Sequence, residues 1–135
     1  MADEIRYIKN IPGGRGDLPF SRAVVANGFV WVSGVGGASQ TSGAGGSTIE
    51  EQTRGTIKNL RTILATAGSS LERVVWIQVG LADPAEYARM NAEYVKHFPD
   101  DQRPARATVK LGFENPNTKL VMACTALAGD RTTSE

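Results

Sequence analysis

Residues 74–98 read VVWIQVGLADPAEYARMNAEYVKHF and change from a strand pattern to a helix pattern. Val74–Leu81 is dense in β-branched and apolar residues, which favours a strand buried on both faces. Asp83 can cap a helix that Pro84 begins, and Pro99 ends it. Residues at three- and four-residue steps share one face of this helix; they are Tyr87, Met90, Tyr94 and Phe98. We therefore predict a strand followed by a helix.

A longer helix is predicted before this unit. Thr48 with Glu51, or Ser47 with Glu50, has the spacing of a capping box. Apolar residues then recur at helical spacing up to Gly68, whose freedom to adopt a positive φ suits a helix C-terminus.

The remaining strands flank the two helices. Asn27-Gly28 joins two β-rich runs and is a strong hairpin signal, because both residues tolerate positive φ. The order strand-strand-strand-helix-strand-helix-strand-strand predicts a single α+β domain over residues 1–135, with a frayed polar tail from about Gly129. The runs predicted as strands are Glu4–Lys9, Ser21–Ala26, Phe29–Ser33, Arg106–Leu111 and Leu120–Leu127.

Two helices can cover one face of such a sheet and leave the other face bare. We expect the bare face to carry Val30, Val32, Trp76, Val109 and their neighbours. A monomer rarely exposes an apolar patch of that size, so the pattern predicts an oligomer.

Composition excludes several classes of function and several kinds of site. The 135 residues include 15 Lys and Arg against 14 Asp and Glu, so the net charge of +1 gives no reason to expect nucleic acid. No stretch is apolar enough for a membrane span. A single cysteine, Cys124, excludes an intrachain disulfide, and the sole histidine, His97, excludes a metal site of several histidines. The acidic start at Met1–Glu4 lacks the apolar core of a signal peptide, and we expect a cytoplasmic protein.

Six short blocks, spread from about Pro19 to Ala128, resemble one known family in their order and spacing. They are Pro19–Val24 (P-F-S-R-A-V), Val32-Ser33-Gly34, Gln52-Thr53, Asn59-Leu60, Asn91 and Tyr94 with Phe98, and Pro104–Val109 (P-A-R-A-T-V). The chain resembles the RidA/YjgF family of reactive-intermediate deaminases, also called the endoribonuclease L-PSP family.

The resemblance implies a chorismate-mutase-like α+β fold, with a mainly antiparallel mixed sheet and two helices on one face. It also implies a homotrimer whose sheets form a central barrel, with sites in the clefts between subunits. The implied activity is hydrolysis of small carboxylate-bearing enamines and imines to 2-oxo acids and ammonia, without a cofactor.

The matched blocks imply a set of site residues. Arg106 matches the family's carboxylate-binding arginine, and a guanidinium can grip a carboxylate with two parallel hydrogen bonds. A structural salt bridge is the alternative for this residue. Ser33 and the backbone of Gly34 and Thr108 match positions that line the family's site. Asn91 either lines the site or, as we favour, positions a helix or a neighbouring subunit.

Two departures from the family pattern stand out. Phe20 replaces a tyrosine of the N-terminal loop and retains only the ring. The last strand has Ala123 and Thr125 where members active on 2-aminoacrylate carry the two glutamates of E-x-E-A-x-A. Loss of general acid–base help costs about 10²–10⁴ in rate. Thr125 can hold a water, and Glu114 is the nearest candidate by sequence to replace the glutamate.

Three functions remain open on this evidence. The first is a deaminase whose substrate is not simple 2-aminoacrylate. The second is a non-catalytic protein that binds a small carboxylate, which the missing glutamates favour. The third is RNA cleavage or translation inhibition, which the balanced charge disfavours.

Other residues have plainer interpretations. We interpret Cys124 as a small core residue, because burial keeps a thiol protonated. Trp31 and Trp76 fit core or interface positions, and Tyr87 and Tyr94 fit packing positions on a helix. The run Gly43–Gly46 is expected to form a flexible loop over the cleft.

Overall fold

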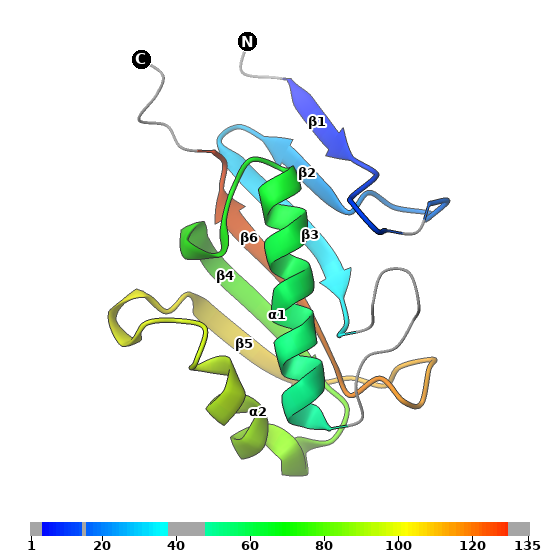
Figure 1. The fold of residues 1–135 in the computed structure, drawn as a ribbon, viewed down its shortest axis with the longest axis vertical. Coiled ribbons are helices and arrows are strands. Elements are labelled where there is room, and N and C mark those ends of the chain that lie inside the picture. Colours follow the sequence, from blue (N-terminus) through cyan, green and yellow to red (C-terminus); the bar gives the residue numbers. More distant parts are fainter. Residues whose placement is uncertain (1–3, 15, 38–47, 130–135) are drawn as a thin grey trace.

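A computed structural model describes residues 4–14, 16–37 and 48–129. In this part of the chain one six-stranded sheet has two α-helices packed on one of its faces (Figure 1). None of the described helices is long and apolar enough to cross a membrane. The predicted loop at Gly43–Gly46 and the tail beyond Gly129 lie outside the described residues. The elements are β1 (Ile5–Ile8), β2 (Ala23–Ala26), β3 (Phe29–Val35), α1 (Ile49–Thr66), β4 (Val74–Leu81), α2 (Tyr87–Tyr94), β5 (Ala105–Lys110) and β6 (Leu120–Leu127).

The strands lie in the order β1-β2-β3-β6-β4-β5. Strands β4 and β5 are parallel, because the chain between them crosses over through α2, and the other described pairs are antiparallel. The predicted element order and the mixed, mainly antiparallel sheet are confirmed. The hairpin between β2 and β3 turns at Asn27 (φ 52°) and Gly28 (φ 86°), as predicted. This topology puts β5 at one edge of the sheet and β1 at the other.

Helix α1 begins and ends where its sequence predicts. The Glu51 amide donates to Thr48 Oγ1 (3.0 Å) and the Thr48 amide donates to Glu51 Oε1 (3.1 Å), which completes a capping box. At the other end Gly68 adopts φ 83°, and its amide donates to the Ala65 carbonyl. Of the alternative capping pair, Ser47 lies outside the described residues.

Polar side chains of α1 fix two loops at the same end of the sheet. The Gln52 side chain donates to the Asn117 carbonyl (2.8 Å) and accepts from the Lys119 amide (2.8 Å). The Asn59 amide donates to the Gly36 carbonyl (2.9 Å). Gln52 and Asn59, which belong to the blocks that resemble the family, therefore hold loops against α1.

Helix α2 is shorter than predicted. A 3₁₀ turn over Pro84–Glu86 precedes it, and it ends at Tyr94 rather than near Phe98. Residues 95–98 form tight turns, in which the His97 amide donates to the Tyr94 carbonyl three residues back. Phe98 is still buried, with its ring centroid 4.7 Å from that of Tyr94.

The bare face of the sheet exists, but its residues differ in part from the prediction. Val30 and Val32 are buried, because they pair with buried residues of β6 on the helix-covered side. A shift of one residue along a strand moves a side chain to the other face. Strand β4 is also not buried on both faces, since Trp76 is 40% exposed. The exposed apolar residues of the bare face are Ile5, Tyr7, Phe29, Trp31, Trp76, Val109 and Leu127.

Candidate functional site

Arg106 lies near the start of the edge strand β5 and points toward α2. It pairs with the buried Ile77 of β4, so its side chain lies on the helix-covered side of the sheet. Its Nη2 donates to the Tyr87 hydroxyl (3.3 Å). The guanidinium carbon lies 4.7 Å from the ring centroid of Tyr94 and 5.8 Å from that of Tyr87. Cation–π contacts of this kind hold the planar group in a defined orientation.

Arg106 forms no ion pair with an acidic side chain in the described part of the chain. By contrast, Arg54, Arg89 and Arg103 each have a carboxylate partner there. Within these residues the structure therefore gives no support to the salt-bridge alternative. The guanidinium is left with the bidentate donor geometry that a substrate carboxylate needs.

Two tyrosines of α2 contact the arginine, and Asn91 of the same helix contacts one of these tyrosines, Tyr87. A side-chain hydrogen bond from Asn91, together with the charge and hydrogen bond of Arg106, lowers the pKa of Tyr87. Burial raises the pKa of Tyr94, and the Arg106 charge opposes that effect. Asn91 thus lies in the surroundings of Arg106, as either of its two interpretations allows.

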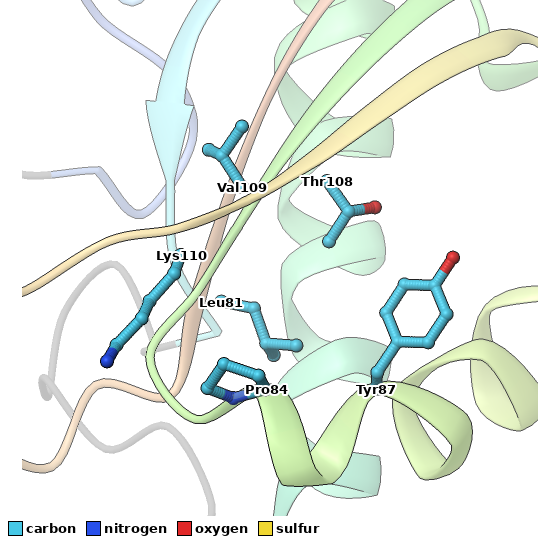
Figure 2. Close-up of a pocket in the computed structure, with 6 residues that line it drawn as sticks. All are labelled: Leu81, Pro84, Tyr87, Thr108, Val109 and Lys110. Atoms are coloured by element: carbon cyan, nitrogen blue, oxygen red, sulfur yellow. The ribbon is translucent and has the colours of Figure 1, made fainter.

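A pocket of about 270 Å³ opens beside this group, at the carboxyl ends of β4 and β5 (Figure 2). Thr108 shares the Arg106 side of β5, and its Oγ1 is buried without a hydrogen-bond partner in the described part of the chain. In Figure 2 the hydroxyl groups of Tyr87 and Thr108 lie toward the same end of the pocket. A buried hydroxyl without a partner is a group that a ligand or a water can satisfy. The pocket is lined by Leu81, Pro84, Tyr87, Thr108, Val109 and Lys110.

The predicted residues of β3 and of the loop before β2 lie elsewhere. The Ser33 hydroxyl donates to the Ser21 carbonyl (2.6 Å), which fixes it at the end of β3. Gly34 is exposed in the irregular part of that strand, beside Val121. Phe20 is exposed in the loop that leads to β2.

Thr125 lies on the bare face, between Trp31 of β3 and Trp76 of β4. Arg106 belongs to the opposite face, so one chain does not bring the two side chains together. Glu114 is exposed in the turn beyond the end of β5, whereas Arg106 lies near the start of that strand. The structure therefore does not bring Glu114 to Arg106 within one chain either.

The predicted site thus falls into two groups. The arginine group consists of Arg106, Thr108 and Asn91 with Tyr87, and the serine group consists of Phe20, Ser33, Gly34 and Thr125. Strands β6 and β4 separate β3 from β5. For β3 the three inter-strand steps amount to about 14 Å, and Thr125 of β6 lies on the opposite face of the sheet from Arg106. The two groups therefore do not meet inside one chain.

Sequence reasoning missed the part that Tyr87 plays in the arginine group. It interpreted Tyr87 as a packing residue, which holds for the buried Tyr94 but not for Tyr87, whose side chain is 47% exposed. The four-residue spacing between Tyr87 and Asn91 puts them on one helix face. That spacing was the available signal, but only the fold brings Arg106 to them.

Cys124 is a core residue, as predicted. It is buried and pairs with Val32 and Ile77, and burial raises the pKa of its thiol to about 12. The described residues contain no group of three His, Cys, Asp or Glu side chains arranged as a metal site.

Fold and site together define a small α+β domain that presents an arginine at one sheet edge and a bare apolar face. A family model described as endoribonuclease L-PSP matches residues 16–128. The chain therefore belongs to this family, the RidA/YjgF family.

Relatives and solved structures agree with that assignment. Protein mmf2, mitochondrial, from Schizosaccharomyces pombe is 38% identical over 111 residues, which cover 80% of this chain and 86% of that protein. Reactive Intermediate Deaminase A, chloroplastic, from Arabidopsis thaliana is 36% identical, over 80% of this chain and 58% of that protein. A YjgF-family crystal structure from Neisseria meningitidis has a TM-score of 0.82 at 28% identity, covering 96% of this chain and 99% of that one. Yeast Mmf1 has a TM-score of 0.82 at 31% identity, covering 93% and 99%.

Proposed function

We propose that this protein is a hydrolytic deaminase of carboxylate-bearing enamines and imines, which gives 2-oxo acids and ammonia. The observation that carries the proposal is the guanidinium of Arg106, held by Tyr87 and Tyr94 beside a pocket and without an acidic partner among the described residues. A relative named Reactive Intermediate Deaminase A supports this choice of chemistry.

The proposed reaction needs binding, a water and proton transfer. An enamine tautomerises to an imine, the water oxygen bonds to its electrophilic carbon, and the carbon–nitrogen bond breaks to release ammonia. A C=N bond is replaced by a C=O bond, and no electrons are transferred to another group. Arg106 binds the carboxylate, and the Thr108 hydroxyl, which has no hydrogen-bond partner among the described residues, offers a hydrogen bond to substrate or water.

We further propose a substrate larger than 2-aminoacrylate. Ala123 and Thr125 stand where the family glutamates would be. The pocket beside the arginine group has a wall of Leu81, Pro84 and Val109, which favours an apolar chain on the substrate.

The proposed active assembly is a homotrimer in which the arginine group of one subunit meets the serine group of the next. Its support is the exposed apolar face and the separation of the two groups within one chain. In this assembly Thr125 or Glu114 of a neighbouring subunit would approach the water. A cytoplasmic location stays a prediction, while the two relatives above have mitochondrial and chloroplastic names.

The test is ammonia release from freshly generated 2-aminoacrylate and from longer carboxylated enamines. We expect acceleration for a longer enamine, loss of it in Arg106→Ala, and no loss in the matched control Arg61→Ala, whose arginine pairs with Glu72 on the surface. Unaccelerated release from every enamine, with Arg106→Ala indistinguishable from wild type, would contradict the proposal.

Binding without turnover is the second candidate, and the residues Ala123 and Thr125 favour it. Thermal stabilisation by 2-oxo acids that is lost in Arg106→Ala, without ammonia release from any enamine, would select it. RNA cleavage is less favoured, because the net charge is +1.

A further inference from the structure

The hydroxyl of Tyr87 is not explained by packing. The buried residues of α2 are Met90, Glu93 and Tyr94, whereas Tyr87 is about half exposed. Its ring lines the pocket, which a phenylalanine would do equally well. The hydroxyl, by contrast, lies against the one side chain that the proposed reaction needs most, Arg106.

The contacts of this hydroxyl leave its proton available. Arg106 donates to the Tyr87 oxygen at 3.3 Å, so the arginine occupies a lone pair and not the O–H. Asn91, one turn later on α2, also hydrogen-bonds the Tyr87 side chain and holds it in place. These neighbours lower the pKa of Tyr87, so its phenol gives up a proton more readily than that of a free tyrosine.

The proposed reaction lacks a proton donor at the usual place. Thr125 does not ionise near neutral pH, and it lies on the opposite face of the sheet from Arg106. Glu114 of the same chain lies beyond the far end of β5, and the Glu114 of a neighbouring subunit is proposed above to approach the water rather than the imine nitrogen. Of the two tyrosines that contact Arg106, Tyr94 is buried beneath the guanidinium, whereas Tyr87 borders the pocket.

We propose that the Tyr87 hydroxyl contacts the substrate bound at Arg106 and donates the proton that the imine nitrogen needs during hydrolysis. The proton moves to nitrogen as the water oxygen bonds to the imine carbon, and Arg106 stabilises the phenolate that forms. The phenolate takes back a proton from the attacking water, which gives a neutral carbinolamine and restores the phenol. A second transfer then completes the hydrolysis: the phenol protonates the amino group, the carbon–nitrogen bond breaks to release ammonia, and the phenolate takes the remaining hydroxyl proton as the C=O bond forms. This inference rests on the proposed function.

The kinetic test compares Tyr87→Phe with wild type on the enamine that wild type turns over. The variant keeps the ring, so we expect a normal fold, a kcat about 100-fold lower and a KM changed by less than about threefold. Wild-type kcat should fall as the pH rises through the pKa of Tyr87, because the donor must be protonated, and the variant should lack that alkaline limb. The control is Thr66→Val, which removes an exposed hydroxyl from the last residue of α1, outside the site and the bare face, and should leave both properties unchanged. A variant that keeps wild-type kcat, or that loses kcat but keeps the alkaline limb, overturns the proposal.

A binding test separates this inference from the proposed function. The phenol of Tyr87 is titrated by its phenolate ultraviolet absorbance, as the difference between wild type and Tyr87→Phe, with and without 2-oxobutanoate. We expect the acid to raise the midpoint, because its carboxylate neutralises the Arg106 charge that lowers the pKa of Tyr87. If 2-oxobutanoate binds in an Arg106-dependent way but leaves the midpoint unchanged, the role of Tyr87 is overturned and the carboxylate site stands. If no 2-oxo acid binds, both proposals fail.

Discussion

The guanidinium of Arg106 is held in one orientation and forms no ion pair among the described residues. It lies over the Tyr94 ring and forms no ion pair with an acidic side chain among the described residues, although the chain carries 14 acidic residues. Its planar fork is the feature that a carboxylate recognises, so charge alone should not replace it.

Arg106→Lys is therefore expected to weaken binding of 2-oxobutanoate about tenfold or more, which is about 1.4 kcal/mol. The physical reason is that an ammonium group cannot form two parallel hydrogen bonds to one carboxylate. Calorimetric titration measures the effect, with Arg61→Lys as the control. Equal affinity in Arg106→Lys and wild type would show that the fork is not used.

Glu93 is the most completely buried charged residue of α2 and contacts three basic side chains. It is 3% exposed and contacts Arg54 (3.3 Å), Lys96 (3.3 Å) and His97 (3.0 Å). Burial acts to raise the pKa of Glu93, but the hydrogen bonds from His97, Arg54 and Lys96 outweigh it and hold the pKa at about 2. The sole histidine thus has a structural partner on its own segment.

This cluster predicts a pH dependence of stability. Because the pKa of Glu93 is lower in the folded than in the unfolded chain, its stabilisation is complete above about pH 4.5 and is lost as the pH falls toward 2. Glu93→Gln should lower the free energy of unfolding by about 1.5–3 kcal/mol at neutral pH. Urea denaturation over a pH series measures it. The difference between variant and wild type should shrink below pH 4.5, and a difference independent of pH would contradict this account.

At the scale of elements, helix α1 is crossed at close range by the segment that follows β3. A Cβ on Gly55 would lie 2.7 Å from the Gly37 carbonyl oxygen, and a Cβ on Gly37 would lie 2.6 Å from the Gln52 carbonyl oxygen. The glycine in the middle of the helix is thus required for close approach of two backbones.

Gly55→Ala consequently reverses the usual effect of this substitution. In an open helix the change would stabilise by about 1 kcal/mol, whereas here overpacking should lower the free energy of unfolding by about 1–3 kcal/mol. Chemical denaturation measures the difference. The exposed helix position Lys58→Ala is the control and should change little. A Gly55→Ala protein more stable than wild type would show that the crossing is not tight.

The elements also show what sequence patterns can predict here. Val74–Leu81 and Leu120–Leu127 were predicted with their exact bounds, because dense apolar runs ended in clear turn residues. Which face of β3 is bare was predicted wrongly, since Val30 and Trp31 are both apolar and alternation carries no signal in such a run. The end of α2 was missed because turn hydrogen bonds after Tyr94 replaced the helical ones.

The site was predicted in part for a related reason. Arg106 was predicted from the block Pro104–Val109, whose residues are adjacent in the sequence and can be recognised without the fold. The neighbourhood of Arg106 and Tyr87 depends on how β5 packs beside α2, so it became visible only in the fold.

At the scale of the whole molecule, the exposed apolar face of the sheet predicts an interface with another chain. Trp31 is 46% exposed and Trp76 is 40% exposed on either side of Thr125. A second copy of the chain would remove these rings from water, which is the main source of stability in such interfaces.

Trp76→Glu should therefore shift the proposed trimer toward monomer, because the variant would place a charge in an apolar contact. Light scattering at micromolar concentration measures the mass. Val95→Glu is the matched control, since Val95 is 41% exposed at the end of α2 and lies outside the bare face. A wild-type protein that is already a monomer at this concentration would remove the basis of the assembly.

A complete site is proposed to need the arginine group of one subunit and the serine group of another. The most direct measurement mixes two variants that should each fail to bind 2-oxobutanoate, Arg106→Ala and Gly34→Leu, after reversible dissociation and reassembly. In a closed ring formed at random, about a quarter of the sites regain both intact groups. We predict that the mixture recovers about that fraction of wild-type binding by calorimetry, while each variant alone stays inactive. A mixture that binds no better than its components, although the mixed oligomer forms, would show that the two groups do not form one site.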